Sequence, residues 1–404
     1  MVRSPNEVFA APGVCSSRGE KGPVTSRERM LIAMTNGRPD RVPVAPDISN
    51  MIPCRLTGKP FWDLYLHNDP PVWRAYVDAV RHFGIDGWFT YGGVAFQHRG
   101  DRREWSSETV SQTDERIVTR TTCRTPDGDL ACETTYYIAD PPTQTRKWVT
   151  DFPADLAKLR WFFPEITGYD RAPLDEMRAC LGEDGALGAC VGLPGFHDLF
   201  SWFDGGLEAA AFAWADHRDA IREFVSWQER DLLRQAEMFL DARPDFLLIG
   251  ASGLWTLSTP GAFRELSLPT FQRITRLAKE AGVPTMLHSC GKERELVRFC
   301  AEETDLDCAN PLEPPPMGDC DLAEVKRAFG DRLALMGNLH TTDVMLRGSV
   351  VDVERAAKKA IDDAAEGGGF ILSTGDQCGR DTPDANLRAL VAAAERYGRY
   401  DRMV

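Results

Sequence analysis

Short apolar runs alternate with longer amphipathic segments along most of the chain. The runs have the length and aliphatic character of buried strands, and most of the segments between them have helical periodicity. The runs cover residues 41–46, 87–90, 186–191, 246–249, 285–287, 306–309, 333–336 and 370–373. The clearest helical segments cover residues 217–240, 269–281, 293–303, 322–329, 351–366 and 382–397. Eight strands, each followed by a helix, predict an α/β fold, and a (β/α)8 TIM barrel rather than an open doubly wound sheet.

Two stretches depart from this alternation. Residues from about 101 to 150 are rich in Thr and Val, and Thr125-Pro126-Asp127-Gly128 is a turn signal, so we expect a β-hairpin insertion there. Residues 1–24 are polar and rich in Gly, Ser and Pro, which predicts a flexible N-terminal extension. The folded domain then spans residues 25–404, and Thr25 with Glu28 is typical of the start of its first helix.

Charge and cysteine content narrow the functional classes. The chain has 404 residues with 47 Lys and Arg and 61 Asp and Glu, a formal charge of −14. This acidic balance argues against nucleic acid or an anionic membrane as a partner. We find no apolar run of about 18 residues that would predict a membrane span. The eleven cysteines have irregular spacing, which fits a reducing cytoplasm better than a disulfide framework.

Polar residues follow several of the predicted strands. The C-terminal ends of barrel strands form the mouth at which TIM-barrel enzymes place their active sites. The candidates at these ends are Asp47, Tyr91, Phe196, His288, Cys290, Asn310, Glu313, His340, Asp376 and Cys378. Residue types that bind metals or transfer protons therefore follow the predicted strands, at the end of the barrel where this fold places its active site.

His288 and Cys290 form the most specific pattern. Side chains two apart in a strand point to the same side, so an imidazole nitrogen and a sulfur can meet at one point. Both are good zinc ligands, and Cys378 would supply a third, leaving the fourth position free as in catalytic zinc sites. A reactive Cys–His pair without metal is the competing interpretation, and buried core cysteines are the plain structural one.

Four other residues have weaker signals. Glu313 lies in the stiff loop Asn310-Pro-Leu-Glu-Pro-Pro-Pro and could support the metal, bind it through oxygen, or be a surface carboxylate. His340 could orient substrate or simply start a helix. Asp47 and Tyr91 could contact substrate or be structural.

Several motifs resemble the uroporphyrinogen decarboxylase superfamily, and within it the zinc-dependent, corrinoid-linked methyltransferase branch. That branch includes coenzyme M methyltransferases and aromatic O-demethylases. The motifs are Asn36-Gly-Arg-Pro-Asp-Arg-Val-Pro-Val44, Leu287-His-Ser-Cys-Gly291 and those in residues 307–314, 331–338, 373–378 and 381–386. The resemblance extends from about residue 25 to the C-terminus and implies the same barrel.

The resemblance also implies a zinc ion held by a His-x-Cys pair and a distant cysteine. His288 and Cys290 match the pair. Aligned backward from Thr382-Pro383, the branch's cysteine would fall nearer Asp376, but Cys378 has the only sulfur in this loop. Cys378 is therefore the expected third ligand, and Asp376 remains an alternative oxygen ligand or a substrate contact.

True uroporphyrinogen decarboxylases have an early Arg-Gln-Ala-Gly-Arg segment whose arginines meet the substrate's carboxylates. The matching stretch here, residues 46–55, has one arginine and one aspartate, which disfavours such a polyanion. The resemblance thus implies a zinc methyltransferase that works with a cobalamin-type corrinoid. This chain shows no Asp-x-His-x-x-Gly corrinoid signature, so we expect the corrinoid on a partner protein.

The methyl donor and acceptor are less defined. Aromatic residues such as Trp255 and Phe196 could line a pocket, with Asn310 and Asp376 as polar contacts, and they favour a methoxylated aromatic ether as the donor. A thiol that accepts methyl from a methylcorrinoid is the alternative. A metal-free decarboxylase using Asp47 and Tyr91, or a non-enzymatic zinc or corrinoid chaperone, are the other hypotheses. The oligomeric state stays open, with a homodimer among the options.

Overall fold

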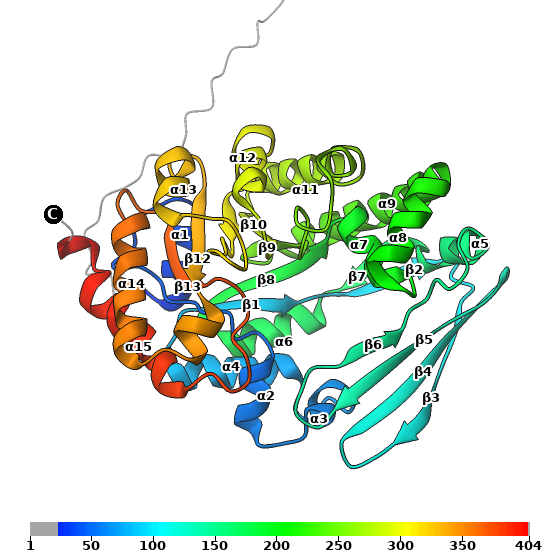
Figure 1. Cartoon of the computed structure of the whole chain (residues 1–404), viewed down its shortest axis with the longest axis horizontal. Coiled ribbons are helices and arrows are strands. Elements are labelled where there is room, and N and C mark those ends of the chain that lie inside the picture. Colours follow the sequence, from blue (N-terminus) through cyan, green and yellow to red (C-terminus); the bar gives the residue numbers. More distant parts are fainter. Residues whose placement is uncertain (1–22, 403–404) are drawn as a thin grey trace, which may run out of the picture.

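The computed structural model describes residues 23–402, and a curled sheet of seven parallel strands lies at its centre (Figure 1). Its strand order is β1-β8-β9-β10-β11-β12-β13. The strands are β1 (Gly87–Gly92), β8 (Gly185–Gly192), β9 (Phe246–Gly250), β10 (Thr285–His288), β11 (Cys308–Asn310), β12 (Ala334–Leu339) and β13 (Phe370–Thr374). Each contains or overlaps one of the predicted apolar runs.

Residues 41–46, the first predicted strand, close this sheet into a barrel. Val44 forms a parallel bridge with Leu372 of β13. On its other side, the carbonyl of Val44 accepts a hydrogen bond of 2.8 Å from the amide of Asp86, directly before β1. This segment therefore lies between the first and last strands of the sheet, and the predicted (β/α)8 barrel is confirmed.

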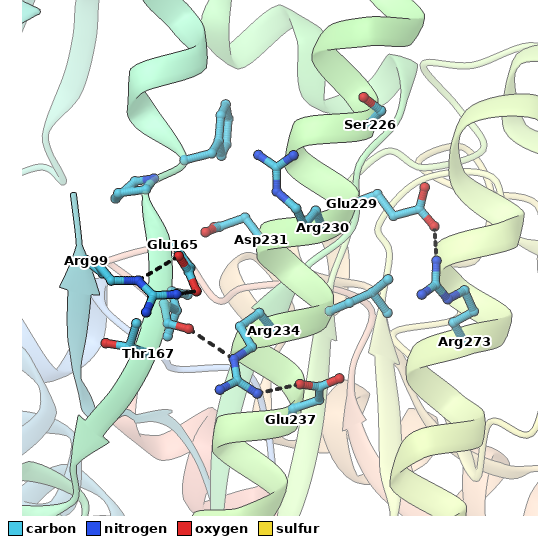
Figure 2. Close-up of a pocket in the computed structure, with 14 residues that line it drawn as sticks. Arg99, Glu165, Thr167, Ser226, Glu229, Arg230, Asp231, Arg234, Glu237 and Arg273 are labelled. Atoms are coloured by element: carbon cyan, nitrogen blue, oxygen red, sulfur yellow. Dashed lines mark hydrogen bonds and ion pairs between the residues drawn. The ribbon is translucent and has the colours of Figure 1, made fainter. Parts of the chain in front are cut away.

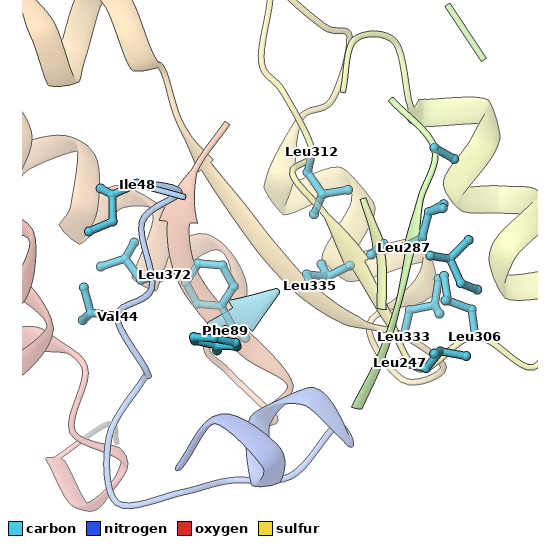
Figure 3. Packing of buried hydrophobic residues seen from close by; sticks show 14 of the residues in the cluster. Val44, Ile48, Phe89, Leu247, Leu287, Leu306, Leu312, Leu333, Leu335 and Leu372 are labelled. Carbon is cyan, nitrogen blue, oxygen red and sulfur yellow. The ribbon is translucent and has the colours of Figure 1, made fainter. Parts of the chain in front are cut away.

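Long helices cover the outer face of the barrel (Figure 1). They are α4 (Val72–Phe83), α6 (Ala172–Leu181), α9 (Arg218–Ala242), α11 (Leu268–Ala281), α12 (Arg294–Glu303), α13 (Leu322–Phe329), α14 (Val350–Ala364) and α15 (Asp384–Tyr397). Their apolar faces pack on the strands, and Figure 3 shows part of this layer, including Leu247, Leu287 and Leu333. The predicted periodic segments match these helices within a few residues, because amphipathic spacing reports the buried face directly.

The interior of the barrel is a second, smaller core, and α1 (Ser26–Met34) closes its bottom. Met30 and Met34 of this helix belong to the same buried cluster as Phe246 and Met286 on the strands. The predicted capping box is present, since Thr25 accepts from the amide of Glu28 and Glu28 accepts from the amide of Thr25. The bottom of the barrel is therefore sealed, and only the opposite end is available for chemistry.

Packing inside the barrel depends on one glycine. A Cβ atom at Gly188 of β8 would lie 2.3 Å from the ring of Phe246 on the neighbouring strand. The large phenylalanine thus fills the space that a side chain on β8 would need. The barrel interior is a packed core and not a pore.

Shorter elements connect the long ones. They are α2 (Met51–Thr57), α3 (Phe61–Tyr65), α5 (Leu156–Leu159), α7 (Phe196–Trp202), α8 (Gly206–Asp216), α10 (Pro260–Ala262), η1 (Arg160–Phe162), η2 (Phe263–Ser267), η3 (Thr341–Leu346) and η4 (Tyr400–Arg402). Most of them follow strand ends and build the rim of the mouth. Within residues 23–402, none of the helices has both the length and the apolar character needed to cross a membrane.

The predicted β-rich insertion follows β1 and is larger than a hairpin. An antiparallel sheet contains β3 (Glu104–Gln112), β4 (Arg116–Thr125), β5 (Gly128–Tyr137) and β6 (Thr143–Arg146), and it projects from the barrel in Figure 1. A second pair, β2 (Ala95–Arg99) and β7 (Glu165–Asp170), joins it to the barrel. The turn at residues 125–128 links β4 to β5, as predicted. The domain limits remain predictions, and residues 1–22 of the expected extension lie outside the described residues.

Candidate functional site

Three predicted residues meet at the mouth of the barrel. His288 is the last residue of β10, Cys290 follows two positions later, and Asp376 lies two residues beyond the end of β13. One ligand atom from each lies within 4.8 Å of the other two. The closest Asp376 oxygen, Oδ1, is 3.8 Å from Nε2 of His288. A nitrogen, a sulfur and a carboxylate oxygen therefore converge on one point.

The neighbouring strands fix the orientation of the His288 ring. The side-chain nitrogen of Asn310, at the end of β11, donates to the carbonyl of Met336 on β12 at 3.3 Å. The Asn310 oxygen is therefore the atom that faces Nδ1 of His288, 2.6 Å away. An oxygen can only accept, so Nδ1 carries the proton. In the neutral ring, Nε2 then has the free electron pair and points toward Asp376, as a metal-binding histidine requires.

The electrostatic field at this point favours a cation. Burial opposes protonation of His288, but the Cys290 thiol, the Asp47 carboxylate and the Asn310 and Asp376 side chains outweigh it and raise its pKa to about 10. The same field that holds a proton on an imidazole would hold a metal ion in its place. The N, S and O donor set suits zinc, which accepts all three ligand types. These residues could therefore hold a divalent ion with one side left for substrate.

Cys378, the third ligand expected from the sequence, is not part of this group. Its backbone amide donates to the carbonyl of Asp47 at 2.8 Å, and its side chain is fully buried in the main apolar core. Burial raises the pKa of its thiol to about 12; its thiol interacts with Thr374 and Thr382, and Asp47 and Asp376 are its charged neighbours. The structure thus brings Asp376, the alternative ligand, to the His-x-Cys pair because the loop turns Cys378 into the core.

Glu313 lies directly beside the ligand loop. Its Oε2 accepts a hydrogen bond from the amide of Gly291, the residue after Cys290. Burial raises the pKa of Glu313 to about 7. The carboxyl group can therefore exchange a proton near neutral pH, which suits a general base.

Glu293 is a residue that the sequence reasoning missed. It is almost fully buried, and its Oε2 accepts from the amide of Glu313 at 3.2 Å. Burial raises its pKa well above the usual range. It ties the loop after β11 to the loop after β10, so it positions Glu313 against Gly291. In the sequence, the only feature that pointed to Glu293 was its position three residues after Cys290, at the start of a helix.

Asp47 and the hydroxyl of Tyr91 are buried next to the donor group. Asp47 is buried, accepts from the amide of Ser49 at 2.9 Å, and has His288 and Asp376 among its charged neighbours. Burial raises its pKa. The Tyr91 hydroxyl is buried, makes no hydrogen bond among residues 23–402, and has Asp47 as a neighbour. Both residues lie close to the donor group, and their roles remain predictions.

Three other candidates do not join the group. His340 begins η3, where its Nδ1 accepts from the amides of Thr342 at 3.2 Å and Asp343 at 3.0 Å. Its position therefore fits the helix-start interpretation. The two aromatic candidates, Trp255 and Phe196, pack into apolar clusters: the Trp255 ring lies 5.5 Å from that of Phe263 and 5.4 Å from that of Phe299, and Phe196 packs on the aromatic cluster around Phe224 and Trp202.

A pocket of about 1120 Å³ lies elsewhere, between β7 and α9 (Figure 2). Ion pairs hold most of its charged residues, for example Arg99 with Glu165 and Arg273 with Glu229. None of the candidate site residues lines it. Its size therefore does not make it a competitor for the chemistry at the mouth.

Parts of the chain are similar to two curated methyltransferases. A stretch of 235 residues is 27% identical to "Methylated-thiol--coenzyme M methyltransferase" of Methanosarcina mazei, covering 52% of this chain and 60% of that protein. Another stretch, of 193 residues, is 28% identical to "Methylcobamide:CoM methyltransferase MtaA" of Methanosarcina barkeri, covering 44% of this chain and 53% of that protein. The chain thus spans little more than half the length of these curated relatives.

The fold has a solved counterpart. A structure described as a methyltransferase from Methanosarcina mazei superimposes with a TM-score of 0.60 over 92% of this chain and 99% of that chain, at 19% identity. At that identity the match shows the shared fold. Residues 209–397, which include all three grouped ligands, match the family described as Uroporphyrinogen decarboxylase (URO-D). This match covers a little under half of the chain and includes the predicted motifs at residues 287–291 and 373–378.

Proposed function

We propose that this protein transfers a methyl group between a small-molecule thiol and a corrinoid carried by a partner protein, with zinc held by His288, Cys290 and Asp376. The convergence of these three donors at the open end of the barrel is the observation that supports the proposal most strongly. The names of two relatives, a methylated-thiol and a methylcobamide methyltransferase, support the reaction class and the corrinoid.

Each residue has a defined task in this proposal. A zinc ion at this point supplies a Lewis acid, which favours the thiolate form of a thiol at neutral pH. Asn310 keeps the proton of His288 on Nδ1 and thereby leaves Nε2 free. Glu313 takes up the thiol proton on Oε1, because its other oxygen already accepts from the amide of Gly291. Asp47 lies behind His288 and balances its charge.

The aromatic methyl ether favoured by the sequence has less support. That prediction was based on aromatic loops, and the rings of Trp255 and Phe196 are engaged in apolar clusters. The ether remains a prediction that none of these contacts favours. A thiol needs only a site for sulfur and a proton acceptor, and the mouth offers both.

Cys290→Ser tests the proposal. Purified protein is assayed for bound zinc and for methyl transfer from methylcobalamin to 2-mercaptoethanol. We expect the variant to bind zinc at least about tenfold more weakly and to lose most of its activity, because a serine hydroxyl is a poor zinc ligand. Its thermal midpoint should stay close to that of the unmodified protein, since Cys290 lies beyond the strand end and is only partly buried.

Cys123→Ser is the matched control, because Cys123 is buried in β4 of the antiparallel insertion and is distant from the donor group in the sequence. It should retain zinc and activity while losing some stability. Unchanged zinc content and rate in Cys290→Ser would refute the ligand assignment. A zinc-loaded protein that moves no methyl group to any thiol from methylcobalamin or a methylated corrinoid protein would refute the function.

A further inference from the structure

Buried acids at the bottom of the barrel are neutralised by arginines. Asp86, directly before β1, pairs with Arg29 at 2.6 Å and with Arg41 at 2.8 Å. Asp245, directly before β9, pairs with Arg27 at 2.7 Å. These pairs are what a buried carboxylate normally requires, because an isolated buried charge is strongly unfavourable.

The acids at the mouth have no such partners. Asp47, Glu293 and Glu313 are each no more than 5% exposed, and within residues 23–402 none of them forms an ion pair with lysine or arginine. The ionic neighbour of Asp376 is His288, at 3.8 Å. A divalent ion on His288, Cys290 and Asp376 would be balanced by those ligands and by Asp47. Among the described residues, these acids still have no lysine or arginine partner that would offset the charge of an anionic substrate.

Two uncharged hydrogen-bond donors, Tyr91 and its neighbour Tyr65, lie on the Asp47 side of the donor group. The hydroxyls of Tyr91 and Tyr65 are buried and make no hydrogen bond among the described residues. Tyr65 has only the Cys54 thiol, a weak partner, beside it, and both Tyr65 and Asp47 are neighbours of Tyr91. By contrast, the nearby Tyr76 hydroxyl is satisfied by the main chain of β1 at 3.1 Å. Buried hydroxyls without partners are uncommon and suit a ligand's oxygen atom.

We propose that the mouth selects a small thiol without negative charge, whose oxygen group accepts hydrogen bonds from Tyr65 and Tyr91, and that Asp47 repels anionic thiols. This inference rests on the proposed function and specifies its substrate class. An anionic group brought within several ångströms of the Asp47 carboxylate, which has no lysine or arginine partner among the described residues, would bind about tenfold more weakly than an uncharged group of the same shape.

Two thiols of nearly equal shape separate charge from size. 2-Mercaptoethanesulfonate has an anionic sulfonate, and 2-(methylsulfonyl)ethanethiol has two sulfonyl oxygens without the charge. Titration calorimetry on the zinc-loaded protein measures binding of each without requiring turnover. We expect the sulfone to bind at least about tenfold more tightly, and Asp47→Asn to reduce this difference to about threefold or less by improving sulfonate binding.

A second pair of ligands tests the hydroxyls. Tyr91→Phe should weaken binding of 2-mercaptoethanol about five- to tenfold and leave ethanethiol, which lacks an oxygen, unchanged. A merely structural role for Tyr91 would weaken both thiols equally and would overturn its assignment. Tyr76→Phe is the control, since its hydroxyl is already occupied, and it should not discriminate between the two thiols.

The outcomes distinguish this inference from the function on which it rests. If the sulfonate binds as tightly as the sulfone or more tightly, the inference is wrong while thiol methylation stands. If neither thiol binds the zinc-loaded protein and no methyl group is transferred, the proposed function fails and the inference fails with it.

Discussion

The choice between Asp376 and Cys378 as third ligand can be tested by a pair of substitutions. Asp376→Asn keeps the shape of the side chain and removes its charge. A unit charge 3.8 Å from the His288 ring would contribute about 4 kcal/mol at an effective dielectric constant of about 20. The Asp376 side chain is 37% exposed, so solvent screening reduces this to about 1–2 kcal/mol. We therefore expect zinc to bind roughly tenfold more weakly.

Cys378→Ala removes the competing sulfur. Its side chain is fully buried and faces the apolar core, so the substitution should leave zinc affinity within about twofold. It should instead lower the free energy of unfolding by about 1–2 kcal/mol, because it opens a small cavity. Zinc affinity is measured by competition with a chromophoric chelator, and stability by urea denaturation of the same preparations.

The refuting pattern is the reverse one. If Cys378→Ala loses zinc and Asp376→Asn keeps it, the loop must rearrange when metal binds and the ligand set expected from the sequence is restored. If both variants lose zinc to the same extent, the metal recruits both residues. Only a selective loss in Asp376→Asn supports the geometry described above.

Two further predictions concern stability. Gly188→Ala should lower the free energy of unfolding by about 1–3 kcal/mol in urea titrations, because its Cβ would overlap the Phe246 ring. The same change at the partly exposed Gly379, where no atom lies within 4 Å of the added Cβ, should be nearly neutral. Burial lowers the pKa of His197 to about 4, so its neutral form is favoured in the folded state. Stability should therefore be complete above about pH 6.5 and fall by about 3 kcal/mol as the pH approaches 4, since only the unfolded chain takes up the proton. His197→Phe should flatten that slope, and an unchanged slope would contradict the assignment.

Most of the fold could be predicted because its signals are local. An apolar run and the helix after it are set by neighbouring residues, so the strands and α13 fall at or near the predicted positions. The pairing of His288 with Cys290 is equally local, since it follows from the two-residue period of a strand. The extent of the insertion was underestimated because pairing among four strands depends on contacts between segments distant in sequence.

The choice of a third candidate ligand depended on where the loop after β13 places its residues, as well as on ligand chemistry. Sulfur is the better zinc ligand, and chemistry alone therefore favoured Cys378. Position favoured Asp376, because it lies only two residues beyond the end of β13, whereas the amide of Cys378 is bound to Asp47. In the structure Asp376, and not Cys378, lies beside His288 and Cys290, since a short loop leaves its first residues at the mouth.

The electronic state of His288 could not be predicted from the sequence at all. It depends on two hydrogen bonds between neighbouring strands. The Met336 carbonyl of β12 orients the side-chain amide of Asn310 on β11. The Asn310 oxygen then keeps the proton on Nδ1 of His288, on β10. Each of these hydrogen bonds joins adjacent strands and depends on how the two groups are oriented. A sequence identifies the donors and acceptors but not their orientations. Asn310→Asp would keep an acceptor for Nδ1 but break the bond to Met336. It therefore separates the orientation of the ring from its electronic state, and the zinc affinity of this variant would show which of the two the proposed site depends on.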